Sequence, residues 1–443
     1  MRELIDRTPE DSKAGLIIPW FSVSDRPTDL RLEESSGLVE ALGCTLSFGR
    51  TEQVRRISPS HLLPVGLLTQ IGEDLVQSGC NLLIVDANLS PVQQRNLERQ
   101  LEVKVIDRTG LILEIFGLRA RTKTGKLQVE LARQLYERSR LVRTWTHLER
   151  QRGGRGFLSG PGESQLEADK RMLDRRVQRL RRDLEDVRRT RGLQRKGRAR
   201  SGIPVIALVG YTNAGKSSLF NALSGASVLA KDMPFATLDP TIRRIPLPHI
   251  GEVALVDTVG FITDLPTHLI ESFQATLEEA LEADLLVHVR DRSSADDHLQ
   301  KNDVELVLNA LEVQSGQALP PMIEAWNKAD LLSEDLYQTL GQTAQTNTPN
   351  KAVLLSAVSG DGLDKLVGLI AGQLRETAIL AVIELSPADG SARSWLHEHS
   401  DVRAEKANPE TGDIEISVSF SATELGQFQA QFPNIRLDAE DAA

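Results

Sequence analysis

The chain has 443 residues, of which 40% are hydrophobic and 26% are charged, so it is long enough for about two to four globular domains. Its only cysteines are Cys44 and Cys80, which excludes a disulfide framework and a cysteine-based zinc site and is typical of a reducing cytosol. No run of about 18 apolar residues occurs, and Met1–Gly15 is charged and lacks the apolar core of a signal peptide. We expect a cytoplasmic monomer without a transmembrane segment, with peripheral association with a membrane as the alternative location.

The charge of the chain is unevenly distributed. The formal net charge is −10, but residues 151–200 hold 16 Lys and Arg against 7 Asp and Glu. A local basic excess in an acidic chain is a candidate contact surface for a polyanion such as nucleic acid.

Residues 1–125 alternate short apolar runs with helical patterns. Ser90 is a candidate N-cap, with Pro91 at the first helical position, for a helix that ends near Leu101. Strands separated by helices predict an N-terminal α/β domain with a largely parallel sheet. The N-terminal segment has no recognisable catalytic cluster, so we expect a binding or regulatory domain. The other predicted elements are strands at Ala14–Phe21, Cys44–Phe48, Asn81–Val85 and Val103–Ile106 and helices at Leu32–Leu42 and Val65–Ser78.

Residues 126–200 are predicted to form an antiparallel helical hairpin that ends in a basic linker, Arg191–Gly202. The helices cover residues 126–150 and about Ser164–Thr190, and a glycine-rich loop, Arg152–Glu163, joins them. Apolar residues of the second helix repeat every seven positions, which is typical of a two-helix coiled coil. The apolar residues concerned are Leu131, Leu135, Val142, Trp145, Leu148, Leu166, Leu173, Val177, Leu180, Leu184 and Val187.

Arginine dominates the outward faces of this hairpin, and a guanidinium group suits bidentate recognition of phosphate. We expect these side chains to contact RNA; the alternative is a solvated helix face without a ligand. The candidate RNA-binding residues are Arg152, Arg155, Arg171, Arg175, Arg176 and Arg179.

A phosphate-binding motif opens the next domain, which is predicted at residues 201–375 as a mixed sheet flanked by helices. Val205–Asn221 has the pattern of a buried strand, a loop and a helix start, and Gly210–Ser217 fits G-x-x-x-x-G-K-[ST]. Backbone N–H groups of such a loop surround phosphates, Lys216 supplies a cation for the β- and γ-phosphates, and the Ser217 hydroxyl suits Mg²⁺. The candidate nucleotide contacts are Gly210, Tyr211, Thr212, Asn213, Ala214, Gly215, Lys216 and Ser217.

Two later segments are candidates for contacts with the γ-phosphate and the metal. The loop Pro234–Arg244 holds two candidate Mg²⁺ ligands, Thr237 and Thr241, of which we favour Thr237. The run from Asp257 to Gly260 fits D-x-x-G, in which the carboxylate reaches Mg²⁺ through water and the glycine N–H reaches the γ-phosphate. The predicted nucleotide contacts are Phe235, Ala236, Thr237, Leu238, Asp239, Asp257, Thr258, Val259 and Gly260, and the predicted catalytic residues are Lys216, Thr237 and Gly260.

The identity of the base is predicted from two further motifs. Asn327, Lys328, Ala329 and Asp330 fit N-K-x-D, in which the aspartate accepts hydrogen bonds from N1–H and N2–H₂ of guanine, a donor pair that adenine lacks. Backbone N–H groups of a third segment can meet guanine O6. That segment is Ser356, Ala357 and Val358. Five motifs in this order predict a GTPase.

Phe261 follows the D-x-x-G motif, where many GTPases have a glutamine that orients the attacking water. Phenylalanine cannot do this, so we expect slow intrinsic hydrolysis and activation by a partner. Asn213 stands where potassium-activated GTPases carry asparagine, so K⁺ is a candidate second cation beside Mg²⁺. An ordinary loop hydrogen bond of Asn213 is the alternative.

Residues 376–443 are predicted to form a small α+β domain without evident chemistry, for which docking or autoregulation is a guess. The predicted elements are strands at Ile379–Leu385 and Asp413–Phe420 and helices at Arg393–His399 and Thr423–Gln431.

Nearly the whole chain resembles the bacterial HflX family of ribosome-associated GTPases, within the TRAFAC class of P-loop GTPases. The resemblance rests on NLLIVDANLSPVQQRNLE, VIDRTGLILEIFGLRARTKTGKLQVELA, GPGESQLEADKR, GYTNAGKSSLFNAL, FATLDPTIR and DTVGFITDLPTHLIESFQATLEE. It implies a GTPase that binds the large (50S) ribosomal subunit and splits or rescues stalled ribosomes under stress, with the N-terminal domain and the hairpin entering ribosomal RNA. Ser164 and Ser218 stand where the family usually has threonine, and each keeps a hydroxyl.

Two other hypotheses compete with this one. The chain could be a nucleotide-gated interaction protein whose coiled coil binds a helical partner. It could also be an RNA-modification GTPase, which ranks last because no catalytic cysteine or cofactor loop accompanies the nucleotide motifs.

Overall fold

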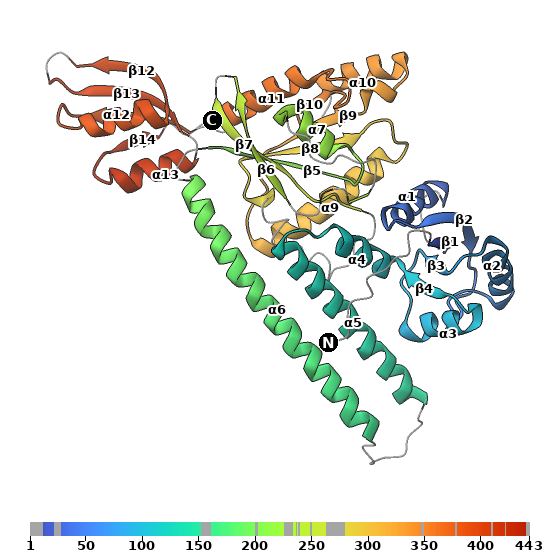
Figure 1. The fold of residues 1–443 in the computed structure, drawn as a ribbon. Coiled ribbons are helices and arrows are strands. Elements are labelled where there is room, and N and C mark those ends of the chain that lie inside the picture. The colour runs from blue at the N-terminus through green and yellow to red at the C-terminus, as the bar shows by residue number, and fades with distance from the viewer. Residues whose placement is uncertain are drawn as a thin grey trace.

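The computed structural model describes residues 12–21, 28–151, 161–199, 203–225, 234–235, 237, 240–248, 250–262, 280–346, 350–376, 379–408, 411–420 and 422–439. Figure 1 shows an N-terminal domain, two long helices, a central domain and a small C-terminal domain. This arrangement confirms the predicted multidomain α/β fold class. None of the described helices combines the length and apolar character needed to cross a membrane.

The N-terminal domain is a parallel four-stranded sheet in the order β2-β1-β3-β4. Side chains of β1 alternate between its faces: Leu16 packs with residues of α1 and α4, and Ile17 packs with residues of α2 and α3. Helices therefore cover both faces, as expected for parallel strands. The elements are β1 (Lys13–Trp20), α1 (Thr28–Ala41), β2 (Thr45–Gln53), α2 (Val65–Ser78), β3 (Leu82–Val85), α3 (Pro91–Leu101), β4 (Lys104–Asp107) and α4 (Arg108–Arg119).

The start of α3 confirms the predicted N-cap. The Ser90 hydroxyl accepts from the N–H of Gln93, and the Gln93 side chain accepts from the N–H of Ser90, which is a capping box. Helix α4 was absent from the sequence prediction. Asp107 caps α4 through Gly110 N–H. Leu111–Leu113 is buried, and the exposed side of the helix holds the apolar Leu118 as well as Glu114, so the sequence shows no clear polar stripe.

Helices α5 (Lys123–Gln151) and α6 (Pro161–Ala199) run side by side in Figure 1. Their seam buries five residues of the predicted apolar stripe: Leu131, Leu135, Val177, Leu180 and Leu184. Leu173 is buried outside this cluster, and Val187 is half-buried. Arg138 on α5 pairs with Asp174 on α6 at 3.1 Å. The prediction of a linker at Arg191–Gly202 was wrong for residues 191–199, which continue α6 because arginine, lysine and leucine favour helix. Pro161–Glu163 likewise belongs to α6 and not to the loop.

Part of the hairpin prediction lies outside what the structure describes. This holds for residues 152–160 of the loop and for the side chains of Val142, Trp145, Leu148 and Leu166.

The central domain is a six-stranded sheet in the order β10-β9-β8-β5-β7-β6, in which only β6 runs antiparallel to its neighbour. Helices α7 and α11 pack on one face through Phe220 and Ile370, and α9 packs on the other through Leu308. The elements are β5 (Val205–Gly210), α7 (Lys216–Ser224), β6 (Thr241–Leu247), β7 (Gly251–Asp257), β8 (Leu285–Asp291), α9 (Asp297–Ser315), β9 (Met322–Asn327), a 3₁₀ turn η1 (Ala329–Leu331), α10 (Glu334–Thr346), β10 (Ala352–Leu354) and α11 (Leu363–Glu376).

The C-terminal domain is an antiparallel sheet in the order β12-β13-β11-β14, with Trp395 of α12 and Phe428 of α13 packed against it. Strands β12 and β14 were not predicted, because β12 is largely exposed and charged and β14 has three residues. The elements are β11 (Ile379–Leu385), α12 (Gly390–His399), β12 (Asp401–Ala407), β13 (Ile414–Phe420), α13 (Ala422–Gln431) and β14 (Leu437–Ala439).

Candidate functional site

The phosphate-binding motif lies at the carboxyl end of β5 and leads into the N-terminus of α7. A Cβ added to Gly210 would lie 2.3 Å from the carbonyl oxygen of Val289, and one added to Gly215 would lie 2.1 Å from Nδ2 of Asn327. Gly210 and Gly215 also have φ angles of 150° and 92°. Both positions therefore need glycine, which lets the loop backbone turn its N–H groups toward a phosphate.

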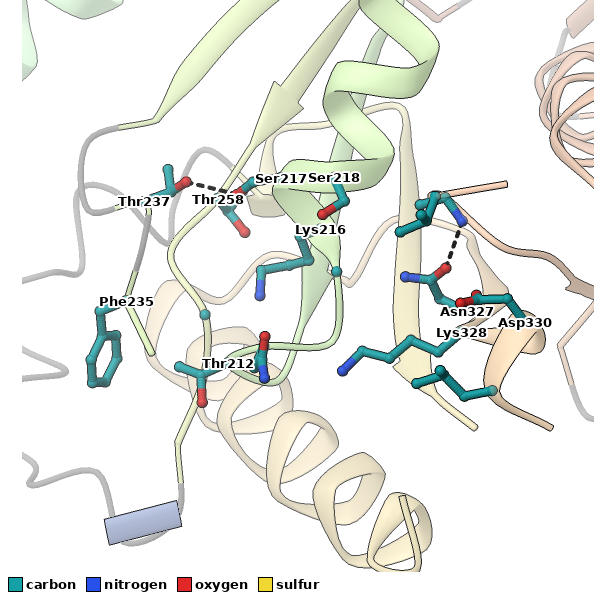
Figure 2. Close-up of a pocket in the computed structure, with 16 residues that line it drawn as sticks. Thr212, Lys216, Ser217, Ser218, Phe235, Thr237, Thr258, Asn327, Lys328 and Asp330 are labelled. Carbon is teal, nitrogen blue, oxygen red and sulfur yellow. Dashed lines mark hydrogen bonds between the residues drawn. The ribbon is translucent and has the colours of Figure 1, made fainter. Parts of the chain in front are cut away.

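A cavity of about 360 Å³ opens at this loop and reaches the loops after β9 and β10 (Figure 2). This size suits a nucleotide-sized ligand. The lining residues are Thr212, Asn213, Gly215, Lys216, Ser217, Ser218, Phe235, Thr237, Thr258, Gly260, Asn327, Lys328, Asp330, Leu331, Ala357 and Val358. The structure thus brings together residues from all five predicted motifs.

Lys216 is buried at the floor of the cavity. Its Nζ donates to the carbonyl oxygens of Gly210, at 3.1 Å, and Tyr211, at 2.7 Å. Burial lowers the pKa of Lys216 to about 8, and the nearby carboxylate of Asp257 opposes this shift. An anionic ligand in the cavity would favour the charged form and draw the ammonium group away from these carbonyls.

Three oxygen-bearing side chains, those of Ser217, Thr237 and Asp257, converge beside Lys216. Oδ2 of Asp257 accepts from the Ser217 hydroxyl at 2.7 Å and from the Thr237 hydroxyl at 2.8 Å, and the two hydroxyls are 2.8 Å apart. Thr241 lies instead within β6, where its backbone pairs with Asp257. The structure therefore places Thr237, and not Thr241, beside Ser217.

The donor set at this point suits a hard divalent cation. Oδ1 of Asp257 is buried and has no hydrogen-bond partner among the described residues. Burial raises the pKa of Asp257, against the hydrogen bond from Ser217, the charge of Lys216 and the hydrogen bond from Thr237. A bound cation would occupy these oxygens and stabilise the carboxylate, so the residues fit Mg²⁺.

The D-x-x-G segment lies directly against the phosphate loop. A Cβ on Gly260 would lie 2.9 Å from Cα of Thr212 and 3.0 Å from Nζ of Lys216. Phe261 is buried; its N–H donates to Gly210 O at 3.1 Å, and its carbonyl accepts from Thr212 N–H at 2.7 Å. The Phe261 ring belongs to an apolar cluster with Tyr211 and does not line the cavity.

At the far end of the cavity, Asn327 ties three loops together. Its Nδ2 donates to Ala214 O, and its Oδ1 accepts from Ala357 N–H, each at 2.9 Å. Asp330 lines the cavity, and its Oδ1 accepts from the Ser356 hydroxyl at 2.6 Å. The carboxylate is therefore fixed in place before any base binds. Lys328 has a left-handed φ of 64° and pairs with Asp291 at 2.8 Å.

Some predicted contacts do not line the cavity. The predicted contacts that are buried and do not line it are Gly210, Tyr211, Ala214, Asp257, Val259, Ala329 and Ser356. Ala236, Leu238 and Asp239 lie outside the described residues. Sequence reasoning missed two lining residues, Ser218 and Leu331. Their positions next to Ser217 and Asp330 were the available signal.

The candidate RNA-binding arginines that the structure describes are exposed on α6. Arg176 forms an ion pair with Glu130 of α5 at 2.6 Å, which partly neutralises its charge. Arg171 lies 4.0 Å from Glu167 and is 67% exposed. Arg175 and Arg179 are also exposed. Arg152 and Arg155 lie outside the described residues.

Four family models match consecutive parts of the chain. They are described as a GTP-binding GTPase N-terminal region (residues 29–117), a GTP-binding GTPase middle region (119–198), a 50S ribosome-binding GTPase (205–328) and an HflX C-terminal domain (340–442).

Full-length relatives agree with these matches. The chain is 40% identical to GTPase HflX of Escherichia coli over 97% of this chain and 98% of that protein. It is 39% identical to GTPase HflX of Magnetococcus marinus over 90% of each. A crystal structure of a GTP-binding protein from Sulfolobus solfataricus in complex with GDP aligns with 25% identity and a TM-score of 0.44, over 82% of this chain and 98% of that one. The four family-model matches, together with about 40% identity over nearly the full chain, show that this chain belongs to the HflX family of GTP-binding, GTP-hydrolysing proteins.

Proposed function

We propose that the protein associates with the large ribosomal subunit, that the subunit activates its GTPase site, and that the protein splits or rescues stalled ribosomes under stress. The observation that carries this proposal is the set of exposed arginines on α6: Arg171, Arg175, Arg176 and Arg179. Figure 1 shows that α6 leads away from the GTPase domain. Ribosomal RNA presents a dense phosphate backbone that these arginines can bind. The family description of a 50S ribosome-binding GTPase supports the same partner.

In the proposed site, the backbone of residues 210–217 surrounds the phosphates and Lys216 neutralises the β- and γ-oxygens. Ser217 and Thr237 would bind Mg²⁺ directly and Asp257 would bind it through water; the metal supplies charge neutralisation on the phosphates. Gly260 N–H would contact the γ-phosphate. Asp330 would accept from guanine N1–H and N2–H₂, and the backbone of residues 356–358 would donate to O6.

Phe261 explains why a partner is part of the proposal. Its ring faces an apolar cluster and offers no group to orient water. The ribosomal subunit would supply or order the missing group, so hydrolysis would be slow without it. We also propose K⁺ as a second cation at Asn213, which lines the cavity. The alternative is a structural role, since the left-handed φ of 61° at Asn213 is a backbone conformation that asparagine tolerates. Replacing K⁺ by Na⁺ in the assay tests this assignment. We further propose that the protein works as a monomer in the cytoplasm.

The decisive experiment compares GTP hydrolysis with and without large ribosomal subunits, and co-migration with them on sucrose gradients in GTP analogue and in GDP. Strong stimulation and binding that depends on the GTP analogue are expected. Equal rates and no co-migration would overturn the proposal.

A matched pair of variants tests the role of α6. Arg175→Glu with Arg179→Glu reverses two exposed charges on the hairpin, and Lys365→Glu with Arg375→Glu makes the same charge change on α11 of the GTPase domain. Only the hairpin pair should lose ribosomal stimulation, and stimulation by the wild type should fall as salt rises. Unchanged stimulation with loss of a protein partner would favour the nucleotide-gated interaction protein.

A further inference from the structure

Three segments around the cavity touch the N-terminal domain: the phosphate loop, the loop that holds Thr237, and the D-x-x-G segment with the residues that follow it. Phe235, between the phosphate loop and Thr237, is 2% exposed, and its ring packs edge-on against Phe116 of α4 with centroids 4.6 Å apart. Val259 and Ile262, on either side of Gly260, are buried in the same apolar cluster, with residues of α1 and α4. The third loop, the phosphate loop, makes a polar contact.

That polar contact joins Tyr211 to Glu34. Tyr211 is the second residue of the phosphate loop and is 5% exposed; its hydroxyl donates to Oε2 of Glu34 on α1 at 2.8 Å. The backbone of Tyr211 is at the same time an acceptor for Lys216, whose Nζ lies 2.7 Å from the Tyr211 carbonyl oxygen. One residue therefore links a carboxylate of the N-terminal domain to the phosphate-binding lysine.

Glu34 does not lie there as an isolated charge. Its Oε1 accepts a hydrogen bond from Arg108, at the start of α4, and the same guanidinium donates to Oδ1 of Asp86 at 2.6 Å. Asp86 follows β3 and also accepts from Arg31 of α1 at 2.6 Å. Arg108 and Asp86 are 4% and 2% exposed. Buried and doubly bonded, the guanidinium fixes the rotamer of Glu34 and leaves Oε2 directed at the tyrosine.

The network sits at a defined place in the sheet. Asp86 and Arg108 directly follow β3 and β4, so they lie at the carboxyl edge of the parallel sheet, where α1 and α4 begin or pack. Figure 1 shows α1 and α4 on the side of the N-terminal domain that faces the GTPase domain. The edge at which parallel sheets usually bind ligands is here occupied by a contact with a phosphate loop.

We propose that Glu34 is a positioning residue for the GTPase site: held by Arg108, it fixes the phosphate loop through the Tyr211 hydroxyl. This rests on the assignment of residues 210–217 to the phosphates. The consequence is that the contact made by α1 and the binding of nucleotide are thermodynamically coupled. A nucleotide that needs the fixed loop stabilises the Glu34 contact, and loss of the contact weakens nucleotide binding by the same factor.

A double-mutant cycle tests the link, with the dissociation constant of a fluorescent GDP analogue in the presence of Mg²⁺ as the readout on the full chain. Tyr211→Phe removes only the hydroxyl and should raise this Kd about two- to tenfold. Glu34→Ala should raise it as well, and Tyr211→Phe should then have no further effect in the Glu34→Ala background. Glu34→Gln keeps an oxygen acceptor for the tyrosine and should restore part of the affinity.

The chain offers a matched control. Tyr136 is another of the three tyrosines; it lies on α5, and its hydroxyl donates to the buried Asp107 at the end of β4 at 2.7 Å. Tyr136→Phe removes the same kind of hydrogen bond away from the cavity, so it can lower the melting temperature but should leave the Kd unchanged.

Amide hydrogen exchange supplies a readout that a purely structural role would not move. In the wild type, GDP should slow exchange in α1, and in Tyr211→Phe this slowing should disappear while the melting temperature stays near that of the wild type. The inference is overturned if Tyr211→Phe binds GDP as the wild type does, or if its effect persists in full in the Glu34→Ala background. A wild type that binds no GDP would instead overturn the assignment of the site.

Discussion

The hydroxyl of Thr237 lies 2.8 Å from the hydroxyl of Ser217, although the two residues are twenty positions apart and belong to different loops. Asp257 holds both through one carboxylate oxygen. Two hydroxyls and a buried carboxylate at one point are oxygen donors of the kind that Mg²⁺ prefers, which supports the proposed metal site. The competing threonine, Thr241, lies in β6, where it pairs with Asp257 of β7 in the sheet.

The first prediction separates these two threonines. Thr237→Val removes the hydroxyl and keeps the shape, so it should lower GTP hydrolysis at limiting Mg²⁺ by at least about tenfold and raise the Mg²⁺ concentration needed for half-maximal rate. Thr241→Val should behave as the wild type, because valine suits a strand. Single-turnover hydrolysis over a Mg²⁺ titration measures both, and equal effects of the two variants would contradict the assignment of Thr237.

The second prediction concerns Gly260. An alanine Cβ would lie 2.9 Å from the backbone of Thr212 and 3.0 Å from Lys216 Nζ, so Gly260→Ala should push the D-x-x-G segment away from the phosphates. We expect hydrolysis to fall by about tenfold or more, with a smaller change in GDP affinity, because the contact is with the γ-phosphate. Gly372→Ala on α11, where a Cβ meets nothing within 4 Å, is the control. A Gly260→Ala protein with wild-type turnover would refute the proposed role.

The third prediction concerns the base. Asp330→Asn replaces an acceptor by an amide that can donate, so affinity for GTP should fall by at least about a hundredfold. Xanthosine triphosphate carries a carbonyl in place of the guanine amino group, so its affinity should rise in the same variant. Competition of both nucleotides against a fluorescent GDP analogue measures the change. Asp364→Asn, at an exposed position at the start of α11, should leave the preference for GTP intact; an unchanged preference in Asp330→Asn would exclude its role.

The fourth prediction concerns pH. Burial lowers the pKa of Lys216 to about 8 in the protein without nucleotide, and phosphate binding favours the charged form. As pH rises through this pKa, binding must take up a proton, so GDP affinity should fall. Between pH 7 and pH 8.5 the Kd should rise about fourfold.

Lys216→Arg is the matched variant for this experiment, since a guanidinium group stays protonated over the whole range. Its affinity will be lower, but its Kd should not change between the two pH values. The effect of Lys216 on folding stability has the opposite dependence on pH. Because its pKa is about 8 in the folded protein and about 10.5 in the unfolded chain, the charged lysine lowers the free energy of unfolding below pH 8. This loss of stability decreases as pH rises from about 8 to 10.5. Nucleotide binding measured on protein verified as folded at both pH values separates the two effects. A flat Kd in the wild type would contradict the prediction.

The sequence by itself determined the features that depend on neighbours along the chain. The strand, loop and helix of Val205–Asn221 were predictable because the glycines, the lysine and the apolar run are contiguous. The start of α3 was predictable because a capping box is a local hydrogen-bond pair between Ser90 and Gln93. The seam of α5 and α6 followed from a seven-residue repeat, although the repeat did not reveal that α6 continues to Ala199.

Only the tertiary structure decided what depends on contacts between distant segments. Sequence spacing favoured Thr237 over Thr241, but only the distances from Thr237 to Ser217 and Asp257 support its place in the proposed metal site. The position of a loop residue depends on the path of the folded chain and not on its neighbours in sequence. Helix α4 escaped prediction because the apolar Leu118 lies on its exposed side together with Glu114, so its sequence shows no clear amphipathic period. The contact of Tyr211 with Glu34 spans 177 positions, and no local pattern encodes a hydrogen bond between two domains.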